Sequence, residues 1–208
     1  VFNASMQPDV EIPMSVHACS IVIAERTHFG GTVTIVTRDT RQQVALARQI
    51  PEADSSTRAG KWEKNKFLGV EIFGKTLGVI GCGNIGSIVA DRALGLKMKV
   101  IAYDPFLSPE RAMALGVEKV ELAELFRRAD FITLHTPLTD KTKNIIDAAA
   151  IKKMKKSVRI INCARGGLVD EAALADALKS GQVAGAAFDV FIEEPATANP
   201  LFGLPNVV

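Results

Sequence analysis

The sequence predicts an α/β fold with a doubly wound, mostly parallel sheet, preceded by an N-terminal segment of different character. Short apolar runs stop at glycine or at polar residues, as buried parallel strands do. Segments with helical spacing of apolar residues lie between these runs, and the alternation persists from residue 76 to residue 188. Such an alternation builds a parallel sheet with helices on both faces.

Residues 1–41 mix prolines and glycines with β-branched stretches, which favours short strands and turns. Residues 42–50 are expected to form a short helix ending at Pro51, followed by a polar arm over 52–66 that carries Trp62. Beyond the arm, apolar runs predict strands and amphipathic spacing predicts helices, the last of them capped by Asp170. The strands are expected at 76–80, 98–103, 131–134, 158–162 and 185–188, and the helices at 84–94, 109–115, 122–127, 148–154 and 171–179.

Composition excludes several classes of protein. The 208 residues are 48% hydrophobic and 23% charged, which is typical of a folded globular chain. A net charge of +2 does not predict a nucleic-acid or membrane surface, and no apolar run approaches the roughly 18 to 20 residues of a membrane span. Cysteines at 19, 82 and 163 are too far apart for a CxxC metal site or a disulfide framework, so we expect no metal and a reducing, cytoplasmic setting. The chain starts at Val1, and its last three residues have the pattern of a strand that is just beginning, so we expect a fragment.

A glycine-rich turn predicts a dinucleotide site. GCGNIG at 81–86 fits G-x-G-x-x-G directly after a predicted strand and at the start of a helix, where backbone amides and the helix dipole can face a pyrophosphate. Asp104 lies 18 residues beyond Gly86 at the end of the next strand, where a carboxylate can bind both ribose hydroxyls and disfavour a 2′-phosphate. The pattern therefore favours NAD over NADP. A glycine turn without a nucleotide, with Asp104-Pro105 as an ordinary turn, is the alternative.

Polar residues also follow the later strands. His135 is best interpreted as a hydrogen-bonded strand-end residue. Arg165 lies between a strand end and two glycines, where it can bind a substrate carboxylate through two hydrogen bonds; a surface arginine beside a flexible loop is equally open. One carboxylate of the Glu193-Glu194 pair could orient a catalytic base, although paired glutamates before a proline often form a solvated turn. Trp62 is a candidate anchor for a partner subunit, with packing onto its own domain as the alternative.

These features together resemble the D-2-hydroxyacid dehydrogenases, most closely their D-3-phosphoglycerate dehydrogenase branch. The resemblance covers about residues 44–208. It is carried by ALARQIPEA at 45–53, GKWEKNKFLGVEIFGKTLGVIGCGNIG at 60–86, YDPFLSPERA at 103–112, FITLHTPLT at 131–139, RIINCARGGLVDEAAL at 159–174 and AGAAFDVFIEEP at 184–195.

The resemblance implies a Rossmann nucleotide-binding domain at 44–208, preceded by a partial or atypical substrate-domain segment at 1–43. It implies NAD-dependent oxidation of 3-phosphoglycerate, with Arg165 binding the substrate carboxylate and Glu194 hydrogen-bonding the catalytic histidine. It also implies a small 2-hydroxy acid as substrate, a homodimer formed through the nucleotide domain, and neither nucleic acid nor membrane as a partner. The implied cofactor contacts are Gly81, Gly83, Asn84, Ile85, Gly86, Asp104, Thr136, Cys163, Ala164, Arg165 and Asp189.

The chain departs from the family pattern in two places. The family's catalytic base is a histidine in a Pro-His-Leu-Gly segment, and none of His17, His28 and His135 occupies that position. Residues 1–43 lack the family's TPFGN-like turn, so contacts to the substrate phosphate cannot be assigned to them. We therefore expect an isolated chain with impaired catalysis. An NAD-binding fragment, an NAD-responsive protein-interaction module and an incompletely folded fragment remain the alternatives.

Overall fold

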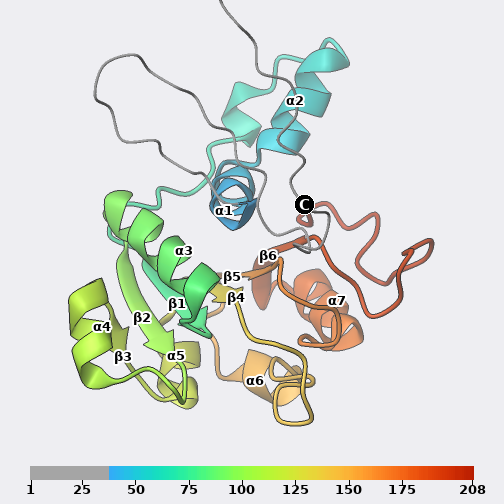
Figure 1. The fold of residues 1–208 in the computed structure, drawn as a ribbon. Coiled ribbons are helices and arrows are strands. Elements are labelled where there is room, and N and C mark those ends of the chain that lie inside the picture. The colour runs from blue at the N-terminus through green and yellow to red at the C-terminus, as the bar shows by residue number, and fades with distance from the viewer. Residues whose placement is uncertain (1–37) are drawn as a thin grey trace, which may run out of the picture.

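The structure is a computed structural model that describes residues 38–208. Helices and strands alternate along most of this range (Figure 1). The strands and turns expected before residue 38, together with His17, His28 and most of the 1–43 segment, lie outside the described residues. The helices are α1 (Arg38–Arg48), α2 (Ile50–Arg58), the 3-10 helix η1 (Lys64–Lys66), α3 (Asn84–Gly95), α4 (Pro109–Leu115), α5 (Leu122–Arg128), α6 (Ala148–Lys152) and α7 (Glu171–Lys179). The strands are β1 (Thr76–Ile80), β2 (Lys99–Tyr103), β3 (Glu118–Lys119), β4 (Phe131–Leu134), β5 (Val158–Asn162) and β6 (Val183–Phe188).

The strands form one parallel sheet in the order β3-β2-β1-β4-β5-β6. The central strand β1 pairs with β2 on one side and with β4 on the other, so that Leu77 is opposite both Val100 and Phe131. This order, in which the chain works outward from β1 first in one direction and then in the other, is that of the Rossmann fold. The predicted fold class is therefore confirmed.

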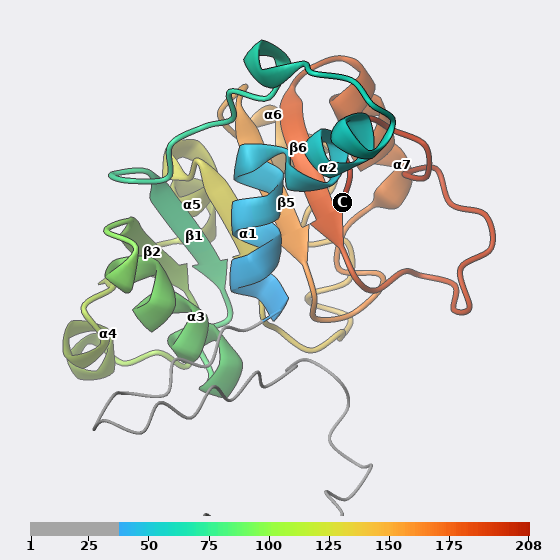
Figure 2. The same ribbon diagram turned by 90° about the horizontal axis from the view of Figure 1, so that it is seen from above.

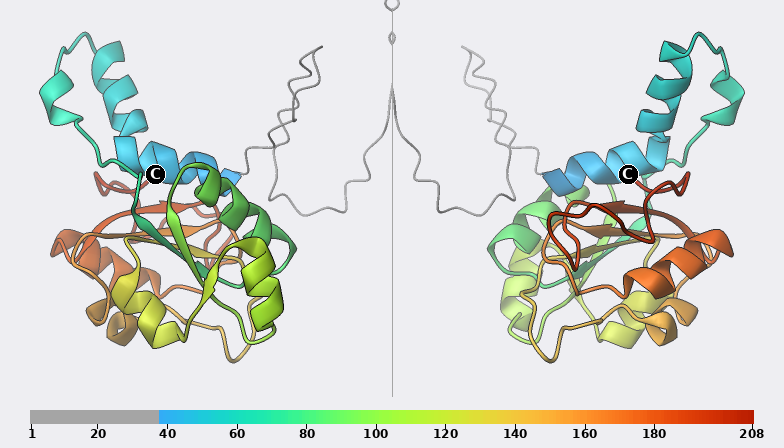
Figure 3. Two further views of the ribbon diagram at one scale, coloured as in Figure 1. Left: turned by 90° about the vertical axis from the view of Figure 1, so that its left-hand side faces the viewer. Right: turned by 90° about the vertical axis from the view of Figure 1, so that its right-hand side faces the viewer.

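Helices cover both faces of the sheet and give it two separate cores (Figures 1 and 3). Residues of α5, α6 and α7 form one core with the sheet side chains that point toward them, and residues of α1, α3 and α4 form the other. All four residues of β4, which was expected as a strand at 131–134, are buried, as is typical of a strand inside a parallel sheet with both faces covered. Among the described residues, no helix is long and apolar enough to cross a membrane.

The region around Pro51 differs from the sequence prediction. A helix was expected to end there and a polar arm to follow it, but α2 runs through Pro51 to Arg58. The break between α1 and α2 occurs at Gln49, which has a left-handed backbone (φ 52°). Pro51 lies in the first turn of α2, where its missing N–H interrupts no helical hydrogen bond. A proline therefore marks the start of the second helix here and does not end the helical region.

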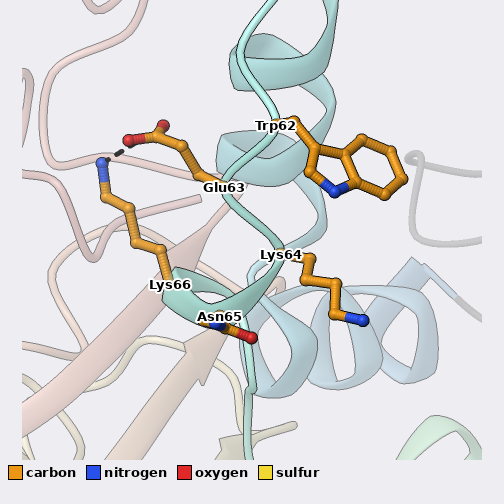
Figure 4. Close-up of a pocket in the computed structure, with 5 residues that line it drawn as sticks. All are labelled: Trp62, Glu63, Lys64, Asn65 and Lys66. Carbon is orange, nitrogen blue, oxygen red and sulfur yellow. Dashed lines mark ion pairs between the residues drawn. The ribbon is translucent and has the colours of Figure 1, made fainter.

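The arm formed by α2 and η1 projects from the sheet domain (Figures 1 and 3). No residue of α2 or η1 is buried. The side chains of Trp62, Leu68 and Phe73 are 85%, 76% and 68% exposed. Trp62 points away from Glu63, which pairs with Lys66 at 3.7 Å (Figure 4). Trp62, which lies between α2 and η1, is therefore a large apolar side chain of the arm that its own domain does not cover.

The chain ends beside β6. Val207 forms a parallel bridge with Ala186, and backbone bonds join Ala186 N to Asn206 O and Val208 N to Ala186 O, both at 2.9 Å. The last residues therefore begin a further strand at this edge of the sheet, as their sequence predicted. Helix α1 crosses the same region on one face, over β5 and β6 (Figure 2).

Candidate active site

The glycine turn lies between β1 and α3, at the carboxyl end of the central strand. Gly81 has a positive φ of 89°, and its N–H donates to Tyr103 O at 2.8 Å. A Cβ at this position would lie 2.6 Å from His135 O, so the turn packs directly against the backbone after β4. Only glycine satisfies both the backbone angle and this contact.

The other two glycines have different roles. A Cβ on Gly86 would lie 2.0 Å from Gly81 O, so Gly86 allows α3 to begin tightly against the turn. A Cβ on Gly83 would meet nothing within 4 Å, which leaves the backbone open to an approaching ligand. No described side chain caps the N-terminus of the 12-residue helix α3, and the turn supplies Asn84 and Ile85 at its first positions. Exposed amides at an uncapped helix N-terminus beside an open glycine fit a dinucleotide pyrophosphate.

Asp104 is held at the end of β2 by two backbone amides. Cys82 N donates to its Oδ2 at 2.7 Å, and Phe106 N donates to its Oδ1 at 2.8 Å. A carboxylate has about four acceptor positions, so two remain for the hydroxyls of a ribose. The bond from Cys82 joins Asp104 to the glycine turn, which places the phosphate and ribose positions side by side. Thr136 lies next to the same turn, because its N would be 3.1 Å from a Cβ on Gly81.

A cavity of about 760 Å³ opens between the loops that follow β5 and β6. Five residues singled out from the sequence line it, although they come from segments up to 31 residues apart, counted from 163 to 194. Parallel strands end at the same edge of a sheet, which explains why the two loops meet. These five residues are Cys163, Ala164, Arg165, Asp189 and Glu194.

Hydrogen bonds fix the Arg165 loop. Asn162, buried at the end of β5, donates from Nδ2 to Arg165 O at 2.9 Å and accepts from Ala164 N at 3.1 Å. The guanidinium of Arg165 donates to Ala164 O at 2.6 Å and is exposed. Within residues 38–208 it takes part in no ion pair, so its charge is available for a carboxylate ligand.

The loop after β6 carries Glu194 into the same cavity. Its Oε1 accepts a hydrogen bond from Phe191 N at 3.0 Å. The carbonyl of Phe191 lies against Gly166, where a Cβ would be only 1.8 Å from that oxygen. Asp189 N donates to Asn162 O at 3.1 Å. The arginine loop and the glutamate loop are thus in direct backbone contact.

Sequence reasoning missed a buried polar cluster between α1 and β4. Asp39 accepts hydrogen bonds from Thr133 Oγ1 at 2.5 Å and from Gln43 Nε2 at 2.8 Å. His135 Nε2 lies 3.1 Å from Thr133 Oγ1 and 3.5 Å from Asp39 Oδ2, and the side chains of His135 and Asp39 are each 3% exposed. His135 is therefore a hydrogen-bonded residue at the end of β4, in agreement with its sequence interpretation. No local pattern could have revealed the cluster, because Asp39 and Thr133 are 94 residues apart.

Burial dominates the protonation of this cluster. It raises the pKa of Asp39, while His135 and the hydrogen bonds from Thr133 and Gln43 oppose that shift. Burial also lowers the pKa of His135, and the charge of Asp39 opposes that shift. The fold thus favours the neutral forms of both side chains.

Cys82 and Cys163 are buried at the ends of β1 and β5. Burial raises the pKa of the Cys82 thiol, and Asp104 adds to the shift, so the thiolate is disfavoured. Cys163 is buried and donates from Sγ to Gln42 Oε1 at 2.7 Å. Among the described residues, no group of three or more His, Cys, Asp or Glu side chains could hold a metal ion.

Comparisons with known proteins agree with this geometry. Residues 41–208 match the family described as D-isomer specific 2-hydroxyacid dehydrogenase, NAD binding domain. The D-3-phosphoglycerate dehydrogenase of Methanocaldococcus jannaschii is 53% identical over 166 residues, which are 79% of this chain and 32% of that protein. The enzyme of the same name from Synechocystis is 44% identical over 200 residues, or 96% of this chain and 36% of that protein. The chain spans about a third of the length of these curated relatives.

A solved structure supports the cofactor assignment. The NAD-dependent formate dehydrogenase of Staphylococcus aureus, in complex with NAD, superposes with a TM-score of 0.76 at 31% identity. The match covers 82% of this chain and 52% of that one.

Proposed function

We propose, from the premise that this chain belongs to the D-isomer specific 2-hydroxyacid dehydrogenase family and contains its NAD-binding domain, that its protein oxidises 3-phosphoglycerate to 3-phosphohydroxypyruvate, the first step of serine biosynthesis. The observation that carries the proposal is the meeting of Arg165 and Glu194 in one cavity, at the edge of the sheet that holds the glycine turn. The choice of 3-phosphoglycerate is supported by the names of the curated relatives that the chain resembles.

The cofactor is proposed to lie along the carboxyl ends of the strands. The amides at the start of α3 would bind its pyrophosphate over Gly83, and Asp104 would accept hydrogen bonds from the adenosine ribose. Thr136, Cys163, Ala164 and Asp189 would line the path toward the nicotinamide. When bound, NAD supplies the nicotinamide ring that accepts the hydride from C2 of the substrate.

Arg165 is proposed to bind and orient the substrate. Its planar guanidinium can form two parallel hydrogen bonds with a carboxylate, and it would also polarise the oxygen on C2. The bonds from Asn162 fix the loop, which limits the freedom of the side chain before substrate arrives.

Glu194 is proposed to act through a histidine base. A carboxylate that accepts a hydrogen bond from the imidazole would orient the ring and raise its pKa, because the negative charge favours the protonated form. The family's Pro-His-Leu-Gly segment has no counterpart among the 208 residues. His135 cannot take this part, since it is buried in the cluster with Asp39. The proposed reaction therefore needs a base from outside this sequence.

The partner of the protein is proposed to be a second copy of the chain, bound through the arm. Helix α2 buries none of its residues, and Trp62, which lies between α2 and η1, is 85% exposed. A short helix without a packed face is marginal in water, so contact with another subunit would stabilise it. We therefore expect a cytoplasmic homodimer in which the arm contacts the second copy.

The test is to supply the missing base. The segment that follows the matched region in the Methanocaldococcus jannaschii relative is fused after Val208, and NADH formation from 3-phosphoglycerate is followed. We expect turnover that depends on both NAD and 3-phosphoglycerate, and a loss of that turnover when the histidine of the fused segment is replaced by Gln. A folded fusion that binds NAD but oxidises lactate or glycerate in preference to 3-phosphoglycerate would refute the substrate. A folded fusion that oxidises no 2-hydroxy acid would refute the proposed activity.

A further inference from the structure

Glu171 is a buried carboxylate at the start of α7, outside the set of proposed catalytic groups. It is 5% exposed, which is rare for a glutamate unless its oxygens are paired. Both oxygens are paired here, and both partners lie in the loop after β6. Ile192 N donates to Oε1 at 3.0 Å, and Asn199 Nδ2 donates to Oε2 at 2.6 Å.

The two partners of Glu171 lie on either side of Glu194. Ile192 comes two residues before it and Asn199 five residues after it, so one carboxylate connects both ends of the segment that carries the acid. Asn199 is itself fixed, because its Oδ1 accepts from Leu201 N at 3.0 Å and Leu201 is fully buried. The segment is therefore anchored at both ends to a buried group, although Glu194 itself is exposed.

Helix α7 also follows the arginine loop along the chain. Asp170, directly before Glu171, caps α7 by accepting from Ala173 N at 3.0 Å. The loop that carries Arg165 ends where α7 begins, and this capped helix start fixes the position of Glu171. On the other side of the cavity, Gly166 lies against Phe191 O, and Phe191 N donates to Glu194.

From this arrangement we propose that Glu171 is a positioning residue, whose two hydrogen bonds hold residues 192–199 so that the carboxylate of Glu194 stays in the cavity beside Arg165. This inference rests on the proposed function, in which Glu194 orients the base. Without Glu171, the loop would keep its contact at Gly166 but lose both anchors around Glu194. Glu171, at the start of α7, would thus determine how well the carboxylate of Glu194 is placed.

The test uses amide hydrogen exchange in the 208-residue chain, observed by NMR. The amide of Ile192 reports the direct bond to Glu171, and the amide of Phe191 reports the position of Glu194, to which it donates. The amide of Val79, in the central strand β1 between β2 and β4, reports global stability because the residue is fully buried. In Glu171→Leu, which keeps a similar side-chain volume but removes both acceptor oxygens, we expect at least tenfold faster exchange at both Ile192 and Phe191, with Val79 unchanged.

A paired substitution provides the rescue. In Glu171→Gln with Asn199→Asp, the amide of Gln can donate to the new carboxylate, while its oxygen still accepts from Ile192 and the Asp still accepts from Leu201. We expect slow exchange at Phe191 to return in this double variant. Asn199→Asp alone places two carboxylates together and should expose both amides.

Each outcome decides the inference. Faster exchange at Ile192 with Phe191 unchanged would overturn it, because Glu194 would then keep its place without Glu171. Faster exchange at all three amides that the double variant does not reverse would also overturn it, since Glu171 would then support the whole domain. NAD titration of the same samples tests the proposed function separately. Asp189 is held by Asn162, so NAD affinity should change less than twofold in Glu171→Leu.

Discussion

Replacing Asp39 by Asn should change how the stability of the chain depends on pH. Asp39 is enclosed between α1 and β4, and burial raises its pKa. Its folded form therefore retains a proton at pH values where the unfolded chain, with an ordinary pKa of about 3.9, has lost it. The stability that this carboxyl group contributes is fully present below about pH 4 and is lost as the pH rises toward the folded-state pKa.

The slope of this effect follows from linkage. Over the interval between the two pKa values, each pH unit lowers the free energy of unfolding by up to about 1.4 kcal/mol. Asn cannot ionise, and it can still accept a hydrogen bond from Thr133. The free energy of unfolding of Asp39→Asn, minus that of the unchanged chain, should therefore increase with pH from about pH 4 and then level off.

His135 contributes with the opposite sign. Burial lowers its pKa, so the unfolded chain takes up a proton first and stability is lost as the pH falls below about 6.5. Both proteins retain His135, so this contribution cancels to first order in their difference.

Urea unfolding followed by circular dichroism measures this difference between about pH 4 and pH 8. Dichroism is preferred because Trp62 is 85% exposed and its fluorescence would report the core poorly. Asp140→Asn, at an exposed position, controls for the loss of one negative charge. A difference that does not vary with pH would show that the pKa of Asp39 is the same in the folded and unfolded chains. A difference that decreases with pH would show that Asp39 is instead stabilised as a charged partner of His135.

Three further predictions concern the site and the arm. Gly83→Ala should leave the melting temperature nearly unchanged but weaken NAD binding at least tenfold by calorimetry, because its Cβ meets open space where a ligand would approach. Gly86→Ala should lower both the melting temperature and the NAD affinity, since its Cβ would lie 2.0 Å from Gly81 O. Equal NAD affinity in the two variants and the unchanged chain would contradict the pyrophosphate site. In the fused enzyme, Arg165→Lys should lower kcat/KM about 100-fold by losing the two-pronged contact, whereas Arg127→Lys on the exposed face of α5 should not. Similar kcat/KM values in the two variants would argue against a substrate carboxylate at Arg165. Trp62→Ala should shift the chain from dimer to monomer in sedimentation velocity, while Phe106→Ala, at 94% exposure outside the arm, should not; a dimer in both would place the interface elsewhere.

The sheet could be predicted from the sequence because its signals are local. The strands β1, β4 and β5 agree with their predicted bounds, since buried parallel strands are short apolar runs with abrupt ends. The cap at Asp170 was likewise visible, and its carboxylate accepts from Ala173 N as expected. The cavity at the strand ends followed from topology, which brings the loops after β5 and β6 together.

The unpredicted features depend on contacts between distant segments. Glu171 has the sequence signature of an ordinary acidic first turn, and its partners Ile192 and Asn199 lie 21 and 28 residues away. Asp39 belongs to a segment whose sequence suggested a departure from the family, yet it is buried against β4. Helix α2 was missed because a proline was interpreted as a helix end, when its position in the first turn favours a helix start.

The central claim is that this chain contains a working NAD site, and calorimetric titration of the purified 208 residues with NAD and with NADP tests it most directly. We expect NAD to bind and NADP to bind at least tenfold more weakly, because a 2′-phosphate would meet the carboxylate of Asp104. We also expect Asp104→Ala to weaken NAD binding by about 100-fold or more, through the loss of two hydrogen bonds to a charged acceptor at roughly 1.5 kcal/mol or more each. A chain that unfolds cooperatively but binds neither nucleotide, or binds NAD equally well without Asp104, would contradict the central claim.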